Sequence, residues 1–241
     1  MYIKIFRNGE IEMKLLTIVL INLFLCISIA AQNFLVETVS GDVKYLSGTE
    51  EEWKPVTKGL SLNGNDVLLT DNKSYVKLNK DGNRFILQSN SALGLNHIEK
   101  VSINDLLLAL AMEEIRNVPK TDGKGNTKNT VVYGSETKGD EQLSINSSDF
   151  GIKRLNGAKQ LAENGFKESA VIVAKETYRK YPDTKKLFEE RLFFADLLAE
   201  LNLYEEAFSE LNSISNLELQ EDETDRVNSK IEKVKMEMAN K

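Results

Sequence analysis

Cysteine and histidine are nearly absent from this chain of 241 residues, which contains one of each, Cys26 and His97. A disulfide needs two cysteines, and a structural zinc site needs several cysteine or histidine ligands. A histidine-based catalytic triad has only His97 available, and a lone histidine next to a strand end is typical of a structural or solvent-facing residue. The composition therefore argues against a thiol-dependent enzyme and against a multi-histidine metal site.

Signals for binding phosphate or nucleic acid are also missing. Gly123-Lys124-Gly125-Asn126 lacks the Gly-Lys-Ser/Thr ending of a phosphate loop, and no strand is predicted before the glycines of 151–157. The formal net charge is −6, and Lys and Arg form no cluster of the kind that binds a nucleic-acid backbone. We therefore expect no cofactor, no metal and no nucleic-acid partner.

The one long apolar run, Leu15 to Ile29, has the features of an export signal. Lys14 precedes it, and Ser28-Ile29-Ala30-Ala31 supplies small side chains for cleavage. Its 15 residues are few for crossing about 30 Å of hydrocarbon at about 1.5 Å per helical residue. We predict that residues 1–31 are a signal peptide, with Met13 as an alternative start, and that the mature chain is periplasmic. An inner-membrane anchor through Leu15 to Ile29 and secretion are the alternatives.

Residues 33–116 have the composition of a small β domain that ends in a helix. β-Branched and aromatic residues alternate with Gly, Asn and Asp, as in short strands joined by turns. Gly41-Asp42 and Asp81-Gly82-Asn83 are predicted hairpin turns. Ser102 and Asp105 form a capping pair that predicts a helix of about 14 residues. The predicted strands are 34–39, 43–46, 66–70, 75–78, 85–88 and 92–95.

Residues 117–150 are polar and rich in glycine, which predicts a linker, although Val131 to Tyr133 is apolar enough for an edge strand. Apolar residues recur at helical spacing from 151 to 241. The predicted fold class is therefore α+β with two domains, an N-terminal all-β sandwich or roll and a C-terminal α-helical array. We expect proteolysis between them to release two folded pieces. The predicted helices are 152–164, 166–180, 184–201, 204–214 and 219–239.

Several short motifs follow one another in the β-rich half. They are Val39-Ser40-Gly41-Asp42-Val43, Trp53-Lys54-Pro55-Val56, Lys58-Gly59-Leu60-Ser61-Leu62, Gly64-Asn65-Asp66-Val67-Leu68-Leu69-Thr70, Ser74-Tyr75-Val76-Lys77-Leu78 and Asp81-Gly82-Asn83 before Arg84-Phe85-Ile86-Leu87. In this order they resemble the periplasmic domain of the FecR (ferric citrate regulator) family. The resemblance implies an envelope domain that reports the state of an outer-membrane transporter to a sigma-factor-binding segment in the cytoplasm. Because at most 14 residues precede the apolar run, we expect the binding role without the cytoplasmic segment.

The helical half carries a second set of motifs. Gly165-Phe166-Lys167-Glu168-Ser169-Ala170 leads to Ala174, Tyr178 and Tyr181-Pro182, and Leu203-Tyr204-Glu205-Glu206-Ala207 leads to Leu211. Both resemble the second helix of a tetratricopeptide repeat, in which small alanines let helices approach closely. The resemblance implies stacked helical hairpins, with the last helix as a cap. The alternative interpretation is an ordinary helical bundle.

Five aromatic residues are candidate interaction residues: Trp53, Tyr45, Tyr75, Tyr178 and Tyr204. Trp53 is also a candidate core residue. Acidic runs at Glu50-Glu51-Glu52, Glu113-Glu114 and Glu221-Asp222-Glu223 are interpreted as solvated surface, and no catalytic residue is assigned.

The leading prediction for function is a non-catalytic, exported protein of the cell envelope that acts in signalling or as a scaffold. Stacked helical hairpins favour a protein or peptide partner, which they bind in a groove. The alternative is a module that binds peptidoglycan or another glycan, with Trp53, Tyr45 and Tyr75 as stacking platforms on one face. A hydrolase is the least favoured prediction.

Overall fold

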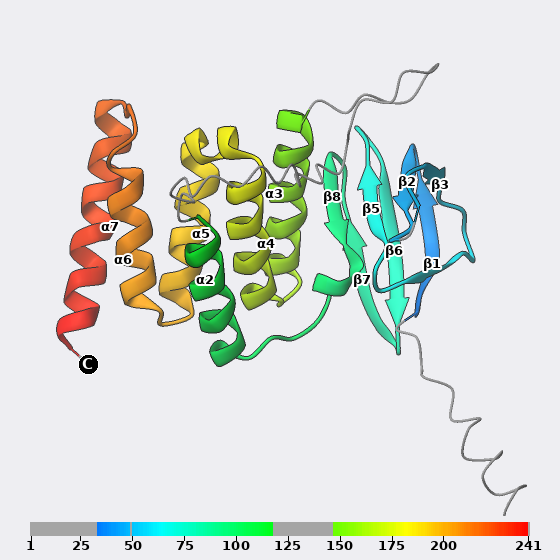
Figure 1. Ribbon diagram of the computed structural model, residues 1–241, viewed down its shortest axis with the longest axis horizontal. Helices are drawn as coiled ribbons and strands as arrows, with labels where there is room; N and C mark the ends of the chain where they lie inside the picture. Colours follow the sequence, from blue (N-terminus) through cyan, green and yellow to red (C-terminus); the bar gives the residue numbers. More distant parts are fainter. Residues whose placement is uncertain (1–32, 49, 118–146, 241) are drawn as a thin grey trace, which may run out of the picture. The chain divides into compact units, whose positions relative to one another are not determined.

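The computed structural model describes residues 33–48, 50–117 and 147–240 (Figure 1). The predicted signal peptide and most of the predicted linker, including Val131 to Tyr133, lie outside these residues. The described residues from Phe34 onward belong to one compact unit. No described helix is long and apolar enough to cross a membrane.

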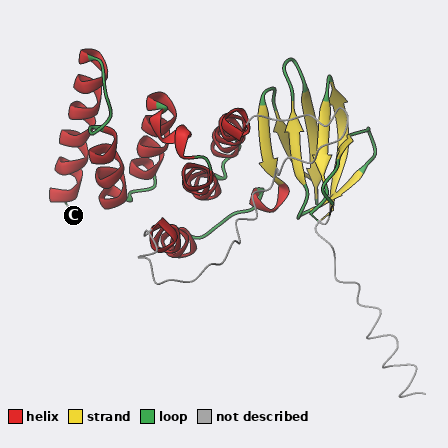
Figure 2. Cartoon of the chain, turned by 45° about the horizontal axis from the view of Figure 1, so that its top comes forward, coloured by secondary structure: helices red, strands yellow, loops and turns green. Residues whose placement is uncertain are grey.

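The N-terminal part consists of two four-stranded antiparallel sheets, and the predicted α+β class is confirmed (Figure 2). The first sheet, in the order β4-β1-β6-β7, contains β4 (Ser61–Asn63), β1 (Asn33–Ser40), β6 (Tyr75–Lys80) and β7 (Asn83–Leu87). The second sheet, in the order β3-β2-β5-β8, contains β3 (Trp53–Pro55), β2 (Val43–Leu46), β5 (Val67–Thr70) and β8 (Ser91–Gly94).

Alternation of buried and half-buried residues shows which face of β6 enters the core. In β6, Val76 and Leu78 are buried, while the alternate residues Tyr75 and Lys77 are half-buried. Leu68 of β5 is fully buried and belongs to the same hydrophobic cluster as these two residues. The two sheets therefore bury one shared apolar layer, which a one-residue slip in register would turn outward.

One predicted hairpin turn is confirmed and one is wrong. Asp81 and Gly82 both have positive φ, 53° and 85°, and join the paired strands β6 and β7, as a type I′ turn requires. Gly41-Asp42 joins β1 and β2, which lie in different sheets. Gly41 has a φ of 75° because the chain changes sheets there, and a Cβ atom on it would lie 2.3 Å from Ser74 Oγ.

All six predicted strands are present, and the sequence prediction omitted β3 and β4. Each of these has three residues, which is too short for an alternating pattern to be recognised. Both are edge strands, and β3 ends with Pro55, which cannot donate to a neighbouring strand.

The five helices predicted after residue 150 are confirmed, with ends that shift by a few residues. Gly165, with a φ of 87°, ends one helix, and Pro182 follows the end of the next. The predicted helix after Ser102 is also present, and the Ser102 hydroxyl donates to Asp105. The helices are η1 (Leu95–His97), α2 (Ile103–Asn117), α3 (Ser147–Glu163), α4 (Lys167–Lys180), η2 (Pro182–Lys186), α5 (Phe188–Glu200), α6 (Tyr204–Ile214) and α7 (Glu221–Ala239).

The helices form two antiparallel hairpins, α3/α4 and α5/α6, followed by α7, which packs on α6 (Figure 1). Ala170 of α4 and Ala207 of α6 are fully buried, as expected for close helix contacts. The α7 helix buries Val227, Ile231 and Val234 and leaves most of its remaining side chains exposed. This polar outer surface suits the end of a helical array. Membership in the tetratricopeptide or FecR family stays a prediction.

The first hairpin is attached to the second sheet along β8, which is an edge strand. Gly157 of α3 lies so close that a Cβ atom on it would stand 2.3 Å from the carbonyl oxygen of Ala92. The side chain of Gln160 accepts from the Gln88 backbone N–H at 2.6 Å and donates to Ser91 Oγ at 2.7 Å. We call these contacts the α3–β8 seam. The seam covers a strand edge that would otherwise be open to pairing with another chain.

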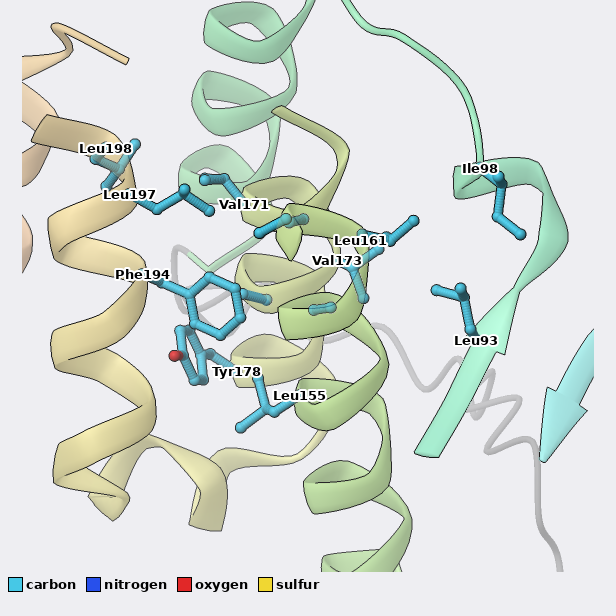
Figure 3. Close-up of a cluster of buried hydrophobic side chains, with 14 of the residues drawn as sticks. Leu93, Ile98, Leu155, Leu161, Val171, Val173, Tyr178, Phe194, Leu197 and Leu198 are labelled. Carbon is cyan, nitrogen blue, oxygen red and sulfur yellow. The ribbon is translucent and has the colours of Figure 1, made fainter. Parts of the chain in front are cut away.

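A second contact, made by α2, also joins the β-rich part to the helical part. This helix follows the β-rich part, yet it packs on α4 of the helical part. Glu113 of α2 is buried and pairs with Arg179 of α4 at 2.5 Å. One hydrophobic cluster extends through both parts, as Figure 3 illustrates with Leu93 of β8 and Leu161 of α3 among residues of α4 and α5. The β-rich and helical parts therefore each contribute an element that packs on the other.

A methyl group at Gly157 tests the seam. Alanine favours a helix over glycine by about 1 kcal/mol, but at this position it must displace α3 from Ala92. We expect Gly157→Ala to lower the free energy of unfolding by about 1–3 kcal/mol, measured by chemical denaturation. Glu163→Ala, at an exposed position of α3, is the control. A gain in stability from Gly157→Ala would show that α3 does not lie this close to β8.

Cleavage between α2 and α3 tests whether the two parts hold together. With a protease site inserted within residues 118–146, we expect the cut fragments to elute from a sizing column as one species, because α2 packs on α4 and α3 on β8. This replaces the release of two pieces that the sequence alone suggests. Separate elution of the fragments without denaturant would contradict it.

Candidate binding groove

An open groove of about 840 Å³ lies over α3, α5 and α7, which are the first helices of the two hairpins and the last helix. Its volume is in the range of ligand sites in proteins, about 300–1,000 Å³. The groove is lined by Lys159 of α3, by Glu189, Leu192, Phe193 and Asp196 of α5, and by Asp225, Arg226, Ser229, Lys230 and Lys233 of α7.

The solvent-accessible side of α5 forms the middle of the groove. Most residues of this helix are buried, including Arg191, Leu192 and Phe194. Glu189, Phe193 and Asp196 are at least partly exposed, and their spacing of four and three residues places them on one face of the helix. The surrounding helices therefore leave a narrow line of α5 for contact with a ligand.

Ion pairs cross the groove from α5 to both neighbouring helices. Glu190 of α5 accepts from Lys159 of α3 at 3.1 Å. On the other side, Glu189 receives two hydrogen bonds from Arg226, at 2.6 and 2.9 Å, and Lys230 lies 2.7 Å from Asp196. The Lys159–Glu190 pair is half-buried and the other two pairs are more exposed. Exposed pairs contribute about 0.2–1 kcal/mol each. Their main effect is to orient side chains along the groove.

A buried charge cluster fixes α5 against its neighbours. Arg191 of α5 and Glu210 of α6 lie 2.6 Å apart with side chains 7% exposed, and Lys175 of α4 reaches the same carboxylate. Burial raises the pKa of Glu210, but Lys175 and Arg191 outweigh that effect and hold the pKa below its ordinary value. Removing one partner would leave a buried charge unpaired, which costs about 3–5 kcal/mol. The cluster therefore sets how α4, α5 and α6 meet, and with them the groove.

The two tyrosines predicted from the helical half are placed differently. Tyr178 is only 4% exposed, and its ring contacts Phe194 at a centroid distance of 6.4 Å (Figure 3). Its hydroxyl has no hydrogen-bond partner within the described part of the chain, and burial raises its pKa well above the ordinary value. Tyr204 is half-buried at the start of α6 and donates to Asn202. Neither tyrosine lines the groove.

The aromatic residues predicted from the β-rich half do not share a face. Tyr45 pairs with the buried Leu68, whereas Trp53 pairs with Leu46, the next residue of β2, so the two rings lie on opposite faces of their sheet. Tyr75 belongs to the other sheet. A common stacking platform, which the glycan-binding alternative requires, is not formed by these three rings.

Trp53 instead belongs to a row of rings between the second sheet and the helices. Its ring lies 6.2 Å from that of Phe150 in α3, which in turn lies 5.9 Å from that of Tyr181, just after α4. Both contacts have edge-to-face geometry, which stabilises a pair by about 0.5–1.5 kcal/mol. This position fits the interpretation of Trp53 as a core residue, since its ring contacts α3 from β3.

Glu113, in one of the acidic runs interpreted as solvated surface, is buried. Glu113 is 7% exposed and pairs with Arg116 at 2.9 Å as well as with Arg179. The run was interpreted as solvated because a carboxylate next to another carboxylate usually is. Burial of Glu113 depends on Arg179 in α4, which the local sequence around residue 113 does not reveal.

The single histidine, His97, is the last residue of η1, and its side chain is 19% exposed and lies 4.0 Å from Glu176 of α4. Burial, followed by the cations of Arg154 and Lys180, lowers its pKa to about 4, although Glu176 opposes them. His97 is therefore a neutral, structural residue between the sheet and the helices at neutral pH. In the described ranges no three His, Cys, Asp or Glu residues group in a way that could hold a metal.

The sequence prediction missed the groove residues themselves. They lie on three helices separated by up to 74 positions in the chain, from Lys159 to Lys233, and each looks like an ordinary exposed charge. The repeat-like pattern was the one available signal, because it predicts hairpins whose first helices face the same side.

The low pKa of His97 predicts loss of stability in mild acid. Its folded-state pKa of about 4 lies below the ordinary 6.5, so the unfolded chain takes up the proton first as pH falls. We expect the free energy of unfolding to decrease between pH 6.5 and pH 4, by up to about 3 kcal/mol from this residue. His97→Gln should flatten the profile in that window. The free energy of unfolding is measured by urea denaturation at each pH. An equal dependence on pH in both proteins would assign the loss of stability to other groups.

Comparison of the chain with known protein families, with curated protein sequences and with solved structures found no match. A functional assignment therefore rests on the groove and its chemistry, and the resemblances to the FecR and tetratricopeptide families remain predictions from sequence motifs.

Proposed function

We propose that this protein is an exported, non-catalytic interaction protein of the cell envelope, and that the groove over α3, α5 and α7 binds a segment of a protein partner. The observation that carries the proposal is the groove itself. It is open, it has a volume of about 840 Å³, and three helices contribute to its lining.

The composition of the groove favours a peptide over a small metabolite. Most of its lining residues are charged or polar and are arranged along the helices, with Phe193 as a partly exposed apolar contact. Polar lining around an aromatic contact suits a segment with mixed side chains. The contacts of the α3–β8 seam attach the β-rich part to the helical array.

Export is the part of the proposal that comes from the sequence alone. Lys14, the apolar run from Leu15 to Ile29 and the small residues before 32 support it. The groove chemistry does not depend on compartment, so location and binding can be tested separately in one experiment.

The test uses a photo-crosslinking amino acid at Ser229, which lines the groove, and at Asn228, which is exposed on the same helix outside it. In cells, we expect capture of a protein partner from position 229 and not from position 228. Ser229→Trp, which fills the groove, should reduce capture at least tenfold when the crosslinker is placed at Lys233, and Asn228→Trp should not. Circular dichroism melting confirms that both tryptophan variants fold.

Equal capture from positions 228 and 229, or no capture from 229, would reject the groove as the binding site. Capture of a cytosolic protein by an uncut chain would reject export and leave the groove in place.

A further inference from the structure

Two opposite charges in the groove have no partner among the described residues, whereas the other charges of its lining are paired. The charged lining residues are Lys159, Glu189, Asp196, Asp225, Arg226, Lys230 and Lys233. Five of these seven take part in three ion pairs, which are Lys159–Glu190, Arg226–Glu189 and Lys230–Asp196. Asp225 and Lys233 form neither an ion pair nor a hydrogen bond with any described residue, and both side chains are exposed.

The two residues lie on one helix at a defined separation. They are eight residues apart in α7, which corresponds to about 12 Å along the helix axis. An extended peptide advances about 3.3 Å per residue, so side chains three or four residues apart in a bound strand span the same distance. Glu189 and Asp196, on either side of Phe193 in α5, pair with Arg226 and Lys230, so Phe193 lies level with the part of α7 between Asp225 and Lys233. The ammonium group of Lys159 lies 5.7 Å from the centroid of the Phe193 ring.

Charge complementarity therefore defines the ligand. We propose that the groove selects an extended peptide segment that carries one basic and one acidic side chain three or four residues apart, with an apolar residue between them. The basic group binds Asp225, the acidic group binds Lys233, and the apolar residue contacts Phe193. This inference rests on the proposed function and adds to it the chemistry and polarity of the partner segment.

The order of the two charges along α7 links the charge order of the ligand to its chain direction. Asp225 is nearer the N-terminal end of α7 and Lys233 nearer the C-terminal end. A peptide with its two charges in the wrong order can place only one of them correctly unless it reverses its chain direction. The paired charges of the groove do not contribute to this selection, because each is already neutralised by a neighbour.

The test begins with a phage-displayed library of random linear ten-residue peptides, selected on the full-length protein. We expect enriched peptides with the opposite-charge spacing, and we expect binding to be lost with Ser229→Trp. In fluorescence anisotropy with one enriched peptide, Lys233→Glu and Asp225→Lys should each weaken binding about two- to fivefold. Lys235→Glu on the same helix, whose partner is Glu232, should leave binding unchanged.

The decisive variant exchanges the charges, Asp225→Lys with Lys233→Asp. In the chain direction of the original peptide, it should bind a peptide with its basic and acidic residues exchanged more tightly than it binds the original peptide. If enriched peptides depend on Ser229 but show no charge spacing, or if the exchanged pair does not rebind, the inference is wrong and the groove function stands. If no enriched peptide depends on Ser229, both fail. A concentration-dependent dimer that Ser229→Trp abolishes would identify a second copy as the occupant and overturn the inference.

Discussion

The close contact between Gly157 of α3 and the carbonyl of Ala92 in β8 is the constraint on which the arrangement depends. Backbone meets backbone there, so α3 can lie along a strand edge that needs a partner. Gln160 then uses both ends of its amide to satisfy polar groups of the sheet at Gln88 and Ser91. A helix with any larger residue at 157 would stand off the strand, and these hydrogen bonds would lengthen or break.

The groove depends on this contact through a chain of packing interactions. The α3 helix is held by β8 and packs on α4, whose Lys175 reaches the buried Glu210 that also binds Arg191 of α5. The position of α5 in turn sets the line of Glu189, Phe193 and Asp196, to which α7 is joined by Arg226 and Lys230. The buried cluster acts mainly on geometry, because the cost of removing charges from water offsets much of its attraction. A rigid sheet and a specific charge cluster together leave three helices with a shared, accessible surface.

Several elements could be predicted because their causes are local. Hydrophobic spacing places the five helices after residue 150, and Asp81-Gly82 specifies its hairpin turn by accepting positive φ at two positions. Gly41-Asp42 looks the same locally, yet it joins strands of different sheets. The difference lies in the partners of β1 and β2, which are β6 and β5, far along the chain. The burial of Glu113 and of Tyr178 likewise depends on residues of other helices.

The sequence by itself determined the order of the longer strands and helices and the α+β class, since propensity and periodicity act over a few residues. Only the tertiary structure decided that α2 packs forward onto α4 while α3 packs back onto β8, joining the two regions in one compact unit. It alone also decided which exposed charges face one groove and which of them pair with another described residue. Both results depend on distances between residues remote in the chain. These distances are fixed when apolar faces and strand edges pack against other elements.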